Sequence, residues 1–353
     1  MAEMMRAAVV HAINDLRIEN VKKPDVPDDS ILVKVQACAI CGTDRRIYRK
    51  GDHRASYPVI TGHEIAGSVE SVSKGVKILK KGDRVCVAPG HGCGYCKMCK
   101  NGYPNVCLNP NPSLGYKVNG GFAEFIAVPE YILRLGFVNL IPESLSFEQA
   151  SMSEILACCL NAQDNAVIQS GETVLIIGSG PAGIMHAHLS KLKGARKVII
   201  TQRSRYRLDL AKTLFPGVVD RTVSSEEENL KEAVMEETDG KGADVIYVCA
   251  PSKEAQESAL ELIANRGRIN FFGGLPKDNC IAKINSNEIH YKEIFISGAS
   301  SSKPVDNKKA LQLLDQRVID PDKIITDVFP LDSIHKGFDV LEEGKCIKVV
   351  IKP

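Results

Sequence analysis

The sequence predicts an α/β protein of two domains, one rich in β-strands and one built on a doubly wound parallel sheet. Three observations lead to this prediction. The chain of 353 residues is longer than a single hydrophobic core usually supports. Short strands punctuated by glycine and proline fill the first third of the chain. From about residue 156, apolar strands alternate with helices, which is typical of a parallel sheet with right-handed crossovers.

Composition and charge exclude several classes of function. Hydrophobic residues make up 44% of the chain and charged residues 25%, which are ordinary globular values and exclude intrinsic disorder. Lysine and arginine total 45 against 43 aspartate and glutamate, so no excess of charge favours a nucleic acid or a membrane as partner. The sequence contains neither a run of 18 apolar residues nor a signal-peptide pattern. We therefore expect a cytoplasmic protein with a small-molecule substrate.

The predicted strands and helices divide the chain into three segments. Residues 1–155 carry short strands, over 31–37, 65–72 and 84–88. Residues 156–293 carry the alternating elements, with strands over 174–177, 198–201, 245–249 and 269–272 and helices over 181–193 and 254–264. Residues 294–353 hold a helix over 306–317 and a strand over 347–351. Since these are too few for a domain of their own, we expect this return segment to complete the first domain.

Four cysteines lie close together in a lobe formed by residues 90–110. They are Cys93, Cys96, Cys99 and Cys107. Four soft ligands without a carboxylate or an imidazole predict a closed, tetrahedral Zn²⁺ site that stabilises the loop. An iron–sulfur cluster is one alternative, but the last gap of seven residues differs from the bacterial Cys-Pro pattern. Free buried cysteines are the other alternative.

A second group of metal-binding side chains stands at the ends of strands. Cys41 follows one predicted strand, and His63 and Glu64 open another. A thiolate, an imidazole and a carboxylate suit a catalytic zinc, which needs three protein groups and one open position. Either motif alone is more typical of packing or of the protein surface. Their occurrence together, upstream of four cysteines and a nucleotide motif, favours a metal centre.

These motifs resemble those of the zinc-dependent medium-chain alcohol and polyol dehydrogenases, of the sorbitol or iditol dehydrogenase type. The resemblance spans nearly the whole chain. It rests on Cys41-Gly42-Thr43-Asp44, Gly62-His63-Glu64-Ile65-Ala66-Gly67, the four-cysteine lobe, Gly120-Gly121-Phe122-Ala123-Glu124, and Glu154 before Leu156-Ala157-Cys158-Cys159. It implies a GroES-like catalytic domain in two pieces, a Rossmann domain between them, and a homodimer or homotetramer.

The resemblance also implies roles for particular residues. Cys41, His63 and either Glu64 or Glu154 would hold the catalytic zinc, with the remaining carboxylate acting directly or through water. The Thr43 hydroxyl would carry away the proton of the substrate alcohol while its hydride passes to the nicotinamide. With the structural zinc, this makes two zinc ions per subunit. The alternative for Glu154 is an ordinary carboxylate at the start of a helix.

A glycine-rich motif indicates the nucleotide site. The apolar strand over 174–177 runs directly into the motif and a helix follows it, which is the context that a dinucleotide fingerprint requires. The glycines allow a tight turn, a close approach of the pyrophosphate and close packing of the helix, whose N-terminus receives the phosphate charge. The motif is Gly178-Ser179-Gly180-Pro181-Ala182-Gly183.

The end of the next strand predicts NADP(H) rather than NAD(H) as the preferred cofactor. An NAD site would carry an acid there, but this chain has Gln202. Arg203 can pair with a 2′-phosphate in bidentate fashion, with Ser204 beside it, and Arg205 or Arg207 can add charge. The pattern is similar to that of NADP-linked ketose reductases of the same family. The alternative is that the arginines lie on the surface of the next helix and Gln202 still binds the ribose.

We therefore expect a zinc-dependent, NADP(H)-linked oxidoreductase that interconverts a secondary alcohol of a polyol, sugar or related small molecule with a ketone. An NAD(H)-linked secondary-alcohol or threonine-type dehydrogenase is the alternative. Threonine is the weaker candidate, because Arg45-Arg46 stand where threonine dehydrogenases commonly carry a histidine. A non-catalytic binding protein on the same fold is a remote alternative, since such a protein should have lost zinc ligands or glycines that this chain keeps.

Overall fold

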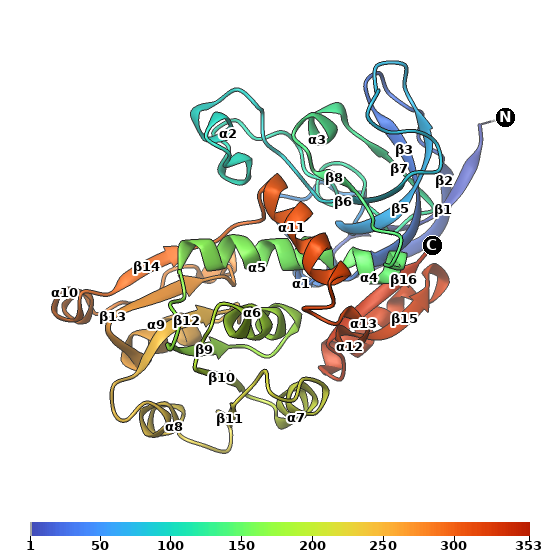
Figure 1. Ribbon diagram of the computed structural model, residues 1–353. Helices are drawn as coiled ribbons and strands as arrows, with labels where there is room; N and C mark the ends of the chain where they lie inside the picture. The colour runs from blue at the N-terminus through green and yellow to red at the C-terminus, as the bar shows by residue number, and fades with distance from the viewer. Residues whose placement is uncertain (1) are drawn as a thin grey trace. The chain divides into compact units, whose positions relative to one another are not determined.

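The computed structural model describes residues 2–353, and the chain divides into two units (Figure 1). Residues up to Ala157 together with Ser302–Pro353 form the first unit, and Cys158–Ser301 form the second. The first unit is a β-rich domain made from both ends of the chain. The second is a Rossmann domain with a parallel sheet. The α/β fold class expected from the sequence is confirmed.

The first unit is built mainly of antiparallel strands. Its first segment contains β1 (Met4–Ala12), β2 (Asp15–Lys22), β3 (Ile31–Ala39), α1 (Gly42–Lys50), β4 (Val59–Ile60), β5 (Glu64–Val72), β6 (Arg84–Val87), α2 (Lys97–Lys100), the 3₁₀ helix η1 (Pro104–Val106), β7 (Phe125–Val128), α3 (Glu130–Arg134), β8 (Val138–Leu140), α4 (Phe147–Ser151) and the start of α5 (Ser153–Asn165). Its second segment contains α11 (Pro304–Asp315), α12 (Pro321–Ile324), β15 (Ile325–Pro330), η3 (Leu331–Ser333), α13 (Ile334–Glu343) and β16 (Lys348–Lys352).

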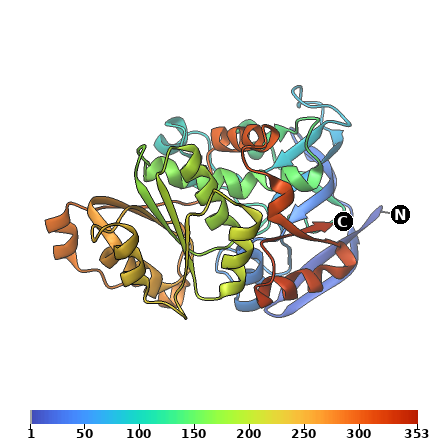
Figure 2. The ribbon, with the colours of Figure 1, turned by 60° about the horizontal axis from the view of Figure 1, so that its bottom comes forward.

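The C-terminal strand is part of the first unit's main sheet. This sheet has the order β15-β16-β3-β5-β6-β8, with β7 also paired to β3. β16 pairs antiparallel with β3, so the last strand of the chain lies beside one of the first, as the red and blue strands of Figure 2 show. A separate three-stranded sheet has the order β2-β1-β4. The core between these elements is apolar and includes the fully buried rings of Phe122 and Phe338.

The second unit alternates strands with helices. It contains the rest of α5, β9 (Thr173–Ile177), α6 (Pro181–Leu192), β10 (Lys197–Gln202), α7 (Arg205–Leu214), β11 (Arg221–Ser224), α8 (Leu230–Glu237), β12 (Ala243–Val248), α9 (Lys253–Leu262), β13 (Ile263–Phe271), η2 (Lys277–Asn279), α10 (Ser286–Lys292) and β14 (Phe295–Gly298). All six strands are parallel, in the order β11-β10-β9-β12-β13-β14. Every residue of β9 is buried, as expected for a central strand covered on both faces.

Several element bounds differ from the sequence prediction: the helix predicted over 306–317 is α11 (Pro304–Asp315), and the strand predicted over 269–272 is the longer β13 (Ile263–Phe271). β14 belongs to the second unit's sheet, because it pairs in parallel with β13, whereas the sequence assigns everything after residue 293 to the return segment. The helix predicted over 254–264 ends at Leu262, since the chain continues at once into β13. No helix within residues 2–353 is both long and apolar enough to cross a membrane.

Candidate active site

Three metal-binding side chains predicted from the sequence meet in the first unit. Cys41 lies between β3 and α1, His63 precedes β5, and Glu64 is the first residue of β5. One donor atom from each of the three lies within 4.8 Å of the others. Antiparallel pairing of β3 with β5 places Ala39 opposite Glu64, which brings the two ends together. The predicted thiolate, imidazole and carboxylate are therefore neighbours.

Asp44 holds the two loops that carry these ligands. Its Oδ2 accepts a hydrogen bond of 2.8 Å from the backbone N–H of Cys41, and its Oδ1 accepts one of 2.9 Å from that of Gly62. The same Oδ1 lies 3.3 Å from Nδ1 of His63. Asp44 is fully buried, and a carboxylate behind a ligating histidine is the usual way in which proteins orient such a ring.

The electrostatics of the site favour a cation. Burial by itself lowers the pKa of His63, but the charges of Asp44 and Cys41 outweigh burial and raise the pKa well above its ordinary value. Oε2 of Glu64 is buried and finds no hydrogen-bond partner among the described residues. An orphaned carboxylate oxygen beside a thiol and an imidazole fits a divalent metal such as zinc, which would satisfy that oxygen and replace the proton on His63.

A buried ion pair lies behind Glu64. Nζ of Lys348, at the start of β16, is 2.6 Å from Oε1 of Glu64, and both side chains are almost completely excluded from solvent. Burial raises the pKa of Glu64 to about 7, with the nearby charge of Glu154 adding to the rise and that of Lys348 opposing it. Lys348 is surrounded by Glu64, Cys41 and Glu154, and their charges outweigh burial and raise its pKa.

Glu154 and Thr43, the other two residues expected at the catalytic centre, lie close to it. Glu154 is buried in the first turn of α5, and its charge acts on both Glu64 and Lys348. Among the described residues it does not join the group whose donor atoms lie within 4.8 Å of one another. Thr43 is half-buried in the first turn of α1, two residues after Cys41.

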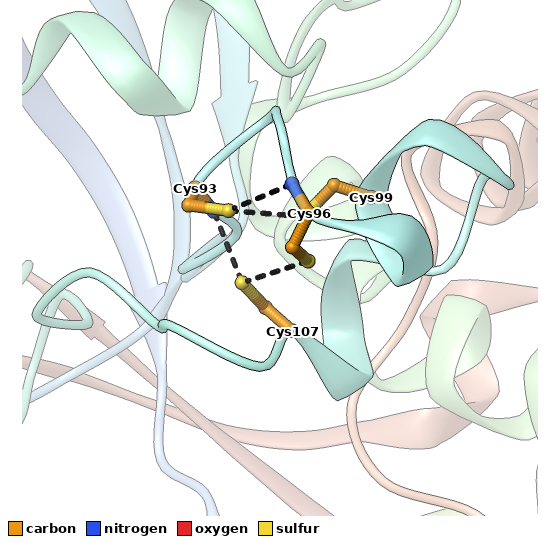
Figure 3. A group of neighbouring side chains, drawn as sticks. All are labelled: Cys93, Cys96, Cys99 and Cys107. Carbon is orange, nitrogen blue, oxygen red and sulfur yellow. Dashed lines mark hydrogen bonds between the residues drawn. The ribbon is translucent and has the colours of Figure 1, made fainter.

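The four cysteines of the lobe also come together, as Figure 3 shows. Their sulfur atoms all lie within 4.8 Å of one another, with 3.9 Å between Cys93 and Cys99 and 3.7 Å between Cys96 and Cys107. Backbone N–H groups point at the sulfurs: that of Cys96 donates to Cys93, and that of Cys93 donates to Cys107. This arrangement fits a tetrahedral site with four thiolate ligands.

Backbone hydrogen bonds help to lower the pKa of two of these thiols, Cys93 and Cys96. Backbone N–H groups of Cys99 and Leu108 lower the pKa of Cys96 to about 6. Burial raises the pKa of Cys99 to about 12, and the neighbouring sulfurs reinforce that rise. Four thiolates so close together need a cation to offset their mutual repulsion, which is what a structural zinc provides.

The glycine-rich motif joins β9 to α6 as predicted, and each glycine has a different neighbourhood. Gly178 has a φ of 117° and packs against Cys249 and Ala250. A Cβ at Gly183 would overlap the carbonyl oxygen of Gly178, whereas a Cβ at Gly180 would meet no atom within 4 Å. The open side at Gly180, which caps the N-terminus of α6 without a side-chain hydrogen bond, fits a pyrophosphate. Pro181 and Ala182 are the first residues of this helix.

The side chains at the end of β10 and in the residues that follow differ in their hydrogen-bond and ion-pair partners. Oε1 of Gln202 accepts a hydrogen bond of 3.3 Å from the backbone N–H of Ser179, so Gln202 ties β10 to the glycine loop. Arg205 forms an ion pair with Glu227, whose charge offsets its own. Arg203 is exposed and forms no ion pair with any described residue. Ser204 precedes α7, and Arg207 lies half-buried within it.

Sequence reasoning did not identify two residues that contact the candidate metal ligands: Asp44, beside His63, and Lys348, beside Glu64. Asp44 was visible within its motif, but nothing in the pattern marks it as a bridge between Cys41 and Gly62. Lys348 lies 284 residues after Glu64, and only the pairing of β16 with β3 brings them together. A lysine at the start of an apolar terminal strand is the single available signal, and it does not specify a partner.

Two family models match the chain. The alcohol dehydrogenase GroES-like domain matches residues 27–135, and the zinc-binding dehydrogenase model matches residues 181–316. Among curated proteins, the chain is 32% identical to a sorbitol dehydrogenase of Bacillus subtilis, covering 99% of this chain and 97% of that protein. It is 33% identical to a D-arabitol-phosphate dehydrogenase of Enterococcus avium, covering 93% and 91%. It is 34% identical to an L-threonine 3-dehydrogenase of Yersinia pseudotuberculosis, covering 94% of each.

Solved structures share the whole fold. A zinc-binding dehydrogenase from Sinorhizobium meliloti bound to NADP superimposes with a TM-score of 0.89 at 30% identity, covering 99% of this chain and 100% of that one. A short chain alcohol dehydrogenase from E. coli CFT073 complexed with NADH also gives 0.89, at 27% identity and 99% coverage of both chains. Structures with either cofactor therefore resemble this chain equally well.

Proposed function

Since this chain belongs to the zinc-binding alcohol dehydrogenases of the medium-chain dehydrogenase family, we propose that it oxidises a secondary alcohol of a polyol or sugar, and reduces the ketone in reverse. One observation carries the proposal: donor atoms of Cys41, His63 and Glu64 lie within 4.8 Å of one another. These three residues would hold the catalytic zinc, with Glu154 as an outer carboxylate. Bound zinc supplies Lewis acidity that lowers the pKa of an alcohol.

The protein's own residues position the reacting groups. Asp44 fixes the loops of Cys41 and Gly62 through two backbone hydrogen bonds, so the ligands need little rearrangement. Lys348 holds one oxygen of Glu64 and leaves the other directed to the site. The Thr43 hydroxyl, half-buried in the first turn of α1, accepts the proton of the alcohol and passes it toward solvent.

We also propose a second zinc ion, which makes two per subunit. It would be bound by the four cysteines of the lobe, Cys93, Cys96, Cys99 and Cys107. The four-thiol donor set has no open position, which suits a structural rather than a catalytic role. The lobe contains only the short elements α2 and η1, neither of which can bury much apolar surface. A metal therefore supplies stability that the packing of the lobe does not.

For the cofactor we propose NADP(H) ahead of NAD(H). Gln202 in place of an acid removes the repulsion that a 2′-phosphate would meet, and Arg203 is the exposed guanidinium beside it. Because Arg205 is neutralised by Glu227, the proposal rests on Arg203 and not on the general positive charge of the segment.

The cofactor proposal is tested by comparing Arg203→Gln with Arg205→Gln. The chain has no tryptophan, so NADPH and NADH can be titrated through their own fluorescence. We expect the zinc-loaded protein to bind NADPH more tightly than NADH, and Arg203→Gln to weaken NADPH binding about 10-fold or more while sparing NADH. Arg205→Gln should leave both affinities unchanged. Tighter binding of NADH by the unmodified protein would contradict the proposal.

The substrate is tested with a panel of secondary alcohols. The similarity to a sorbitol dehydrogenase and to a D-arabitol-phosphate dehydrogenase favours a polyol, while that to an L-threonine 3-dehydrogenase keeps threonine as a second candidate. We would measure kcat/KM for sorbitol, iditol, galactitol, butanediol, isopropanol and threonine with both cofactors. Turnover confined to threonine would replace the polyol proposal, and turnover neither of these compounds nor of a phosphorylated or carboxylated polyol would contradict both.

We also propose that the chain forms a homodimer or homotetramer. β14 is an edge strand of the second unit's sheet, and an edge strand offers unpaired backbone groups to another chain. Phe295 on β14 is 58% exposed and Tyr291 on the preceding helix is 79% exposed, which is unusual for rings of this size. Light scattering should show an oligomer that Phe295→Asp dissociates, whereas a monomeric unmodified protein would contradict the proposal.

A further inference from the structure

A pair of arginines shares one carboxylate near the candidate metal centre. Nε and Nη2 of Arg54 donate to the two oxygens of Asp52 at 3.0 and 2.7 Å, and Nε of Arg46 donates to Asp52 at 2.9 Å. The backbone N–H of Arg54 donates to the same carboxylate. We call Arg46, Asp52 and Arg54 the arginine cluster. Neither the proposed chemistry nor the cofactor site uses it.

The Asp52 carboxylate holds both arginine side chains in place but accepts hydrogen bonds from only some of their N–H groups. Its side chain is only 4% exposed, and although burial opposes ionisation, the hydrogen bonds and charge of Arg54 hold the pKa of Asp52 well below its ordinary value. Two guanidinium groups against one carboxylate leave a net positive charge. Nη1 of Arg54 and both terminal nitrogens of Arg46 find no partner among residues 2–353, and the side chains are 48% and 29% exposed. Several N–H donors in fixed positions are therefore available.

Tyr116 connects the cluster to the metal centre. The guanidinium of Arg54 lies over the Tyr116 ring at 5.0 Å from its centroid, and that ring lies 5.7 Å from the ring of His63. The backbone N–H of Ser56 donates to the carbonyl oxygen of Tyr116, which ties together the loops that carry Arg54 and Tyr116. The charge of Cys41 also contributes to raising the pKa of Arg54, after the larger influence of Asp52. Arg54 is thus two ring contacts from the predicted ligand His63, and Arg46 is joined to Arg54 through Asp52.

We propose that the arginine cluster binds an anionic end group of the substrate, so that the preferred substrate is a phosphorylated or carboxylated polyol. This inference rests on the proposed function, because it assigns the substrate class of the same site. Guanidinium groups suit phosphate and carboxylate oxygens because their planar donors match both. Two other titratable side chains lie beside Asp52: His53, with Nδ1 3.7 Å from Asp52, and Tyr57, whose pKa is raised by burial, with the charge of Asp52 adding to the rise.

The test compares three ligands with the same carbon skeleton: sorbitol, sorbitol 6-phosphate and gluconate. Their Kd values are measured by calorimetry on the zinc-loaded enzyme saturated with reduced cofactor, which prevents oxidation during the titration. We expect one or both anions to bind at least 10-fold more tightly than sorbitol. Arg54→Gln should raise the Kd of the anion about 10- to 100-fold, the effect of losing charge-assisted hydrogen bonds, and leave that of sorbitol nearly unchanged.

Arg17→Gln provides a matched control. Arg17 makes the same bidentate pair, with Asp15, on an exposed surface of the same unit, so its loss should change no Kd. Tight binding of sorbitol 6-phosphate alone identifies a phosphate site, and tight binding of gluconate alone identifies a carboxylate site. Equal binding of all three ligands, binding of none, or an equal loss for all three in Arg54→Gln would overturn the inference.

Turnover separates the inference from the proposed function. The same three compounds, together with the panel of secondary alcohols, are tested with oxidised cofactor. Oxidation of neutral polyols with no preference for the anions would overturn the anion site and leave the dehydrogenase. Anion binding that depends on Arg54, without oxidation of any compound, would support the anion site and contradict the proposed reaction.

Discussion

The ammonium group of Lys348 lies 2.6 Å from the carboxylate of Glu64, so the final strand of the chain is joined to the candidate metal centre through a buried ion pair. The side chains are 1% and 0% exposed. A pair so fully removed from water is sensitive to the loss of one partner, since the other then remains as a buried charge.

Lys348→Met should therefore destabilise the protein. We expect the free energy of unfolding to fall by about 3 to 5 kcal/mol, because Glu64 would keep its burial and lose its counter-charge. Urea unfolding followed by circular dichroism measures the change. Lys352→Met is the matched control on the same strand: Lys352 pairs with Glu148 and is 51% exposed, so its loss should cost under about 1 kcal/mol. Equal costs for the two variants would contradict the interpretation.

Cys41→Ser should stop turnover while keeping the fold. A serine hydroxyl is a poor zinc ligand at neutral pH, so we expect the metal content to fall by one zinc ion per subunit and kcat to become undetectable. Elemental analysis and the melting temperature are measured on the same samples. Cys280→Ser, at an exposed cysteine outside both groups, should change neither quantity. A Cys41→Ser enzyme with full activity would remove Cys41 from the centre.

Cys96→Ser should destabilise the folded structure of the lobe, while zinc stays bound at the catalytic centre. We expect the loss of the other zinc ion, and faster cleavage by trypsin at Lys97 and Lys100, because α2 and η1 have little packing of their own. Limited proteolysis with mass spectrometry locates the cut. Addition of a strong chelator to the unmodified protein should give the same fragments. Fragments unchanged by either treatment would show that the lobe does not depend on a metal.

His186 should make the second unit sensitive to acid. Its ring is buried and stacks on Tyr247 with centroids 4.4 Å apart, and burial lowers its pKa to about 3 from an ordinary 6.5. Between these two values the unfolded chain binds a proton that the folded chain does not, so stability falls as pH falls from about 6.5 toward 3. The slope attributable to this residue is at most about 1.4 kcal/mol per pH unit.

The measurement is urea unfolding across that pH range for the unmodified protein and for His186→Phe, which keeps an aromatic ring against Tyr247. The free energy of unfolding of His186→Phe should depend less on pH below 6.5. His290→Phe, on an exposed face of α10, should keep the original dependence. Parallel pH profiles for the unmodified protein and His186→Phe would exclude His186 as the cause.

The two groups of candidate metal ligands could be proposed from the sequence because thiol, imidazole and carboxylate side chains are the usual ligands of zinc. Cys41, His63 and Glu64 could be grouped from their positions at strand ends, and the four cysteines of the lobe from their spacing. Asp44 and Lys348 could not be assigned roles in the same way, since each acts through atoms contributed by distant segments. Their roles depend on a backbone hydrogen bond to Gly62 and on the pairing of β16 with β3.

The second unit shows a similar division. The strand, glycine motif and helix were predictable because φ and packing restrict what can stand at Gly178 and Gly183. Whether Arg205 forms an ion pair could not be predicted in the same way, because its partner Glu227 lies 22 residues away in the sequence. The position of β14 was also missed, since a short strand carries no mark of which sheet it joins.

The order of the segments along the chain has a consequence for biosynthesis. Cys158–Ser301 is continuous and precedes the last part of the first unit, so a ribosome completes the nucleotide-binding unit before it produces β16. Cys41, His63 and Glu64 are translated early, whereas the ammonium that neutralises Glu64 arrives with the final residues. The three candidate ligands are therefore present in a nascent chain long before the counter-charge of Glu64, and a transcript truncated before residue 348 would encode all three without Lys348.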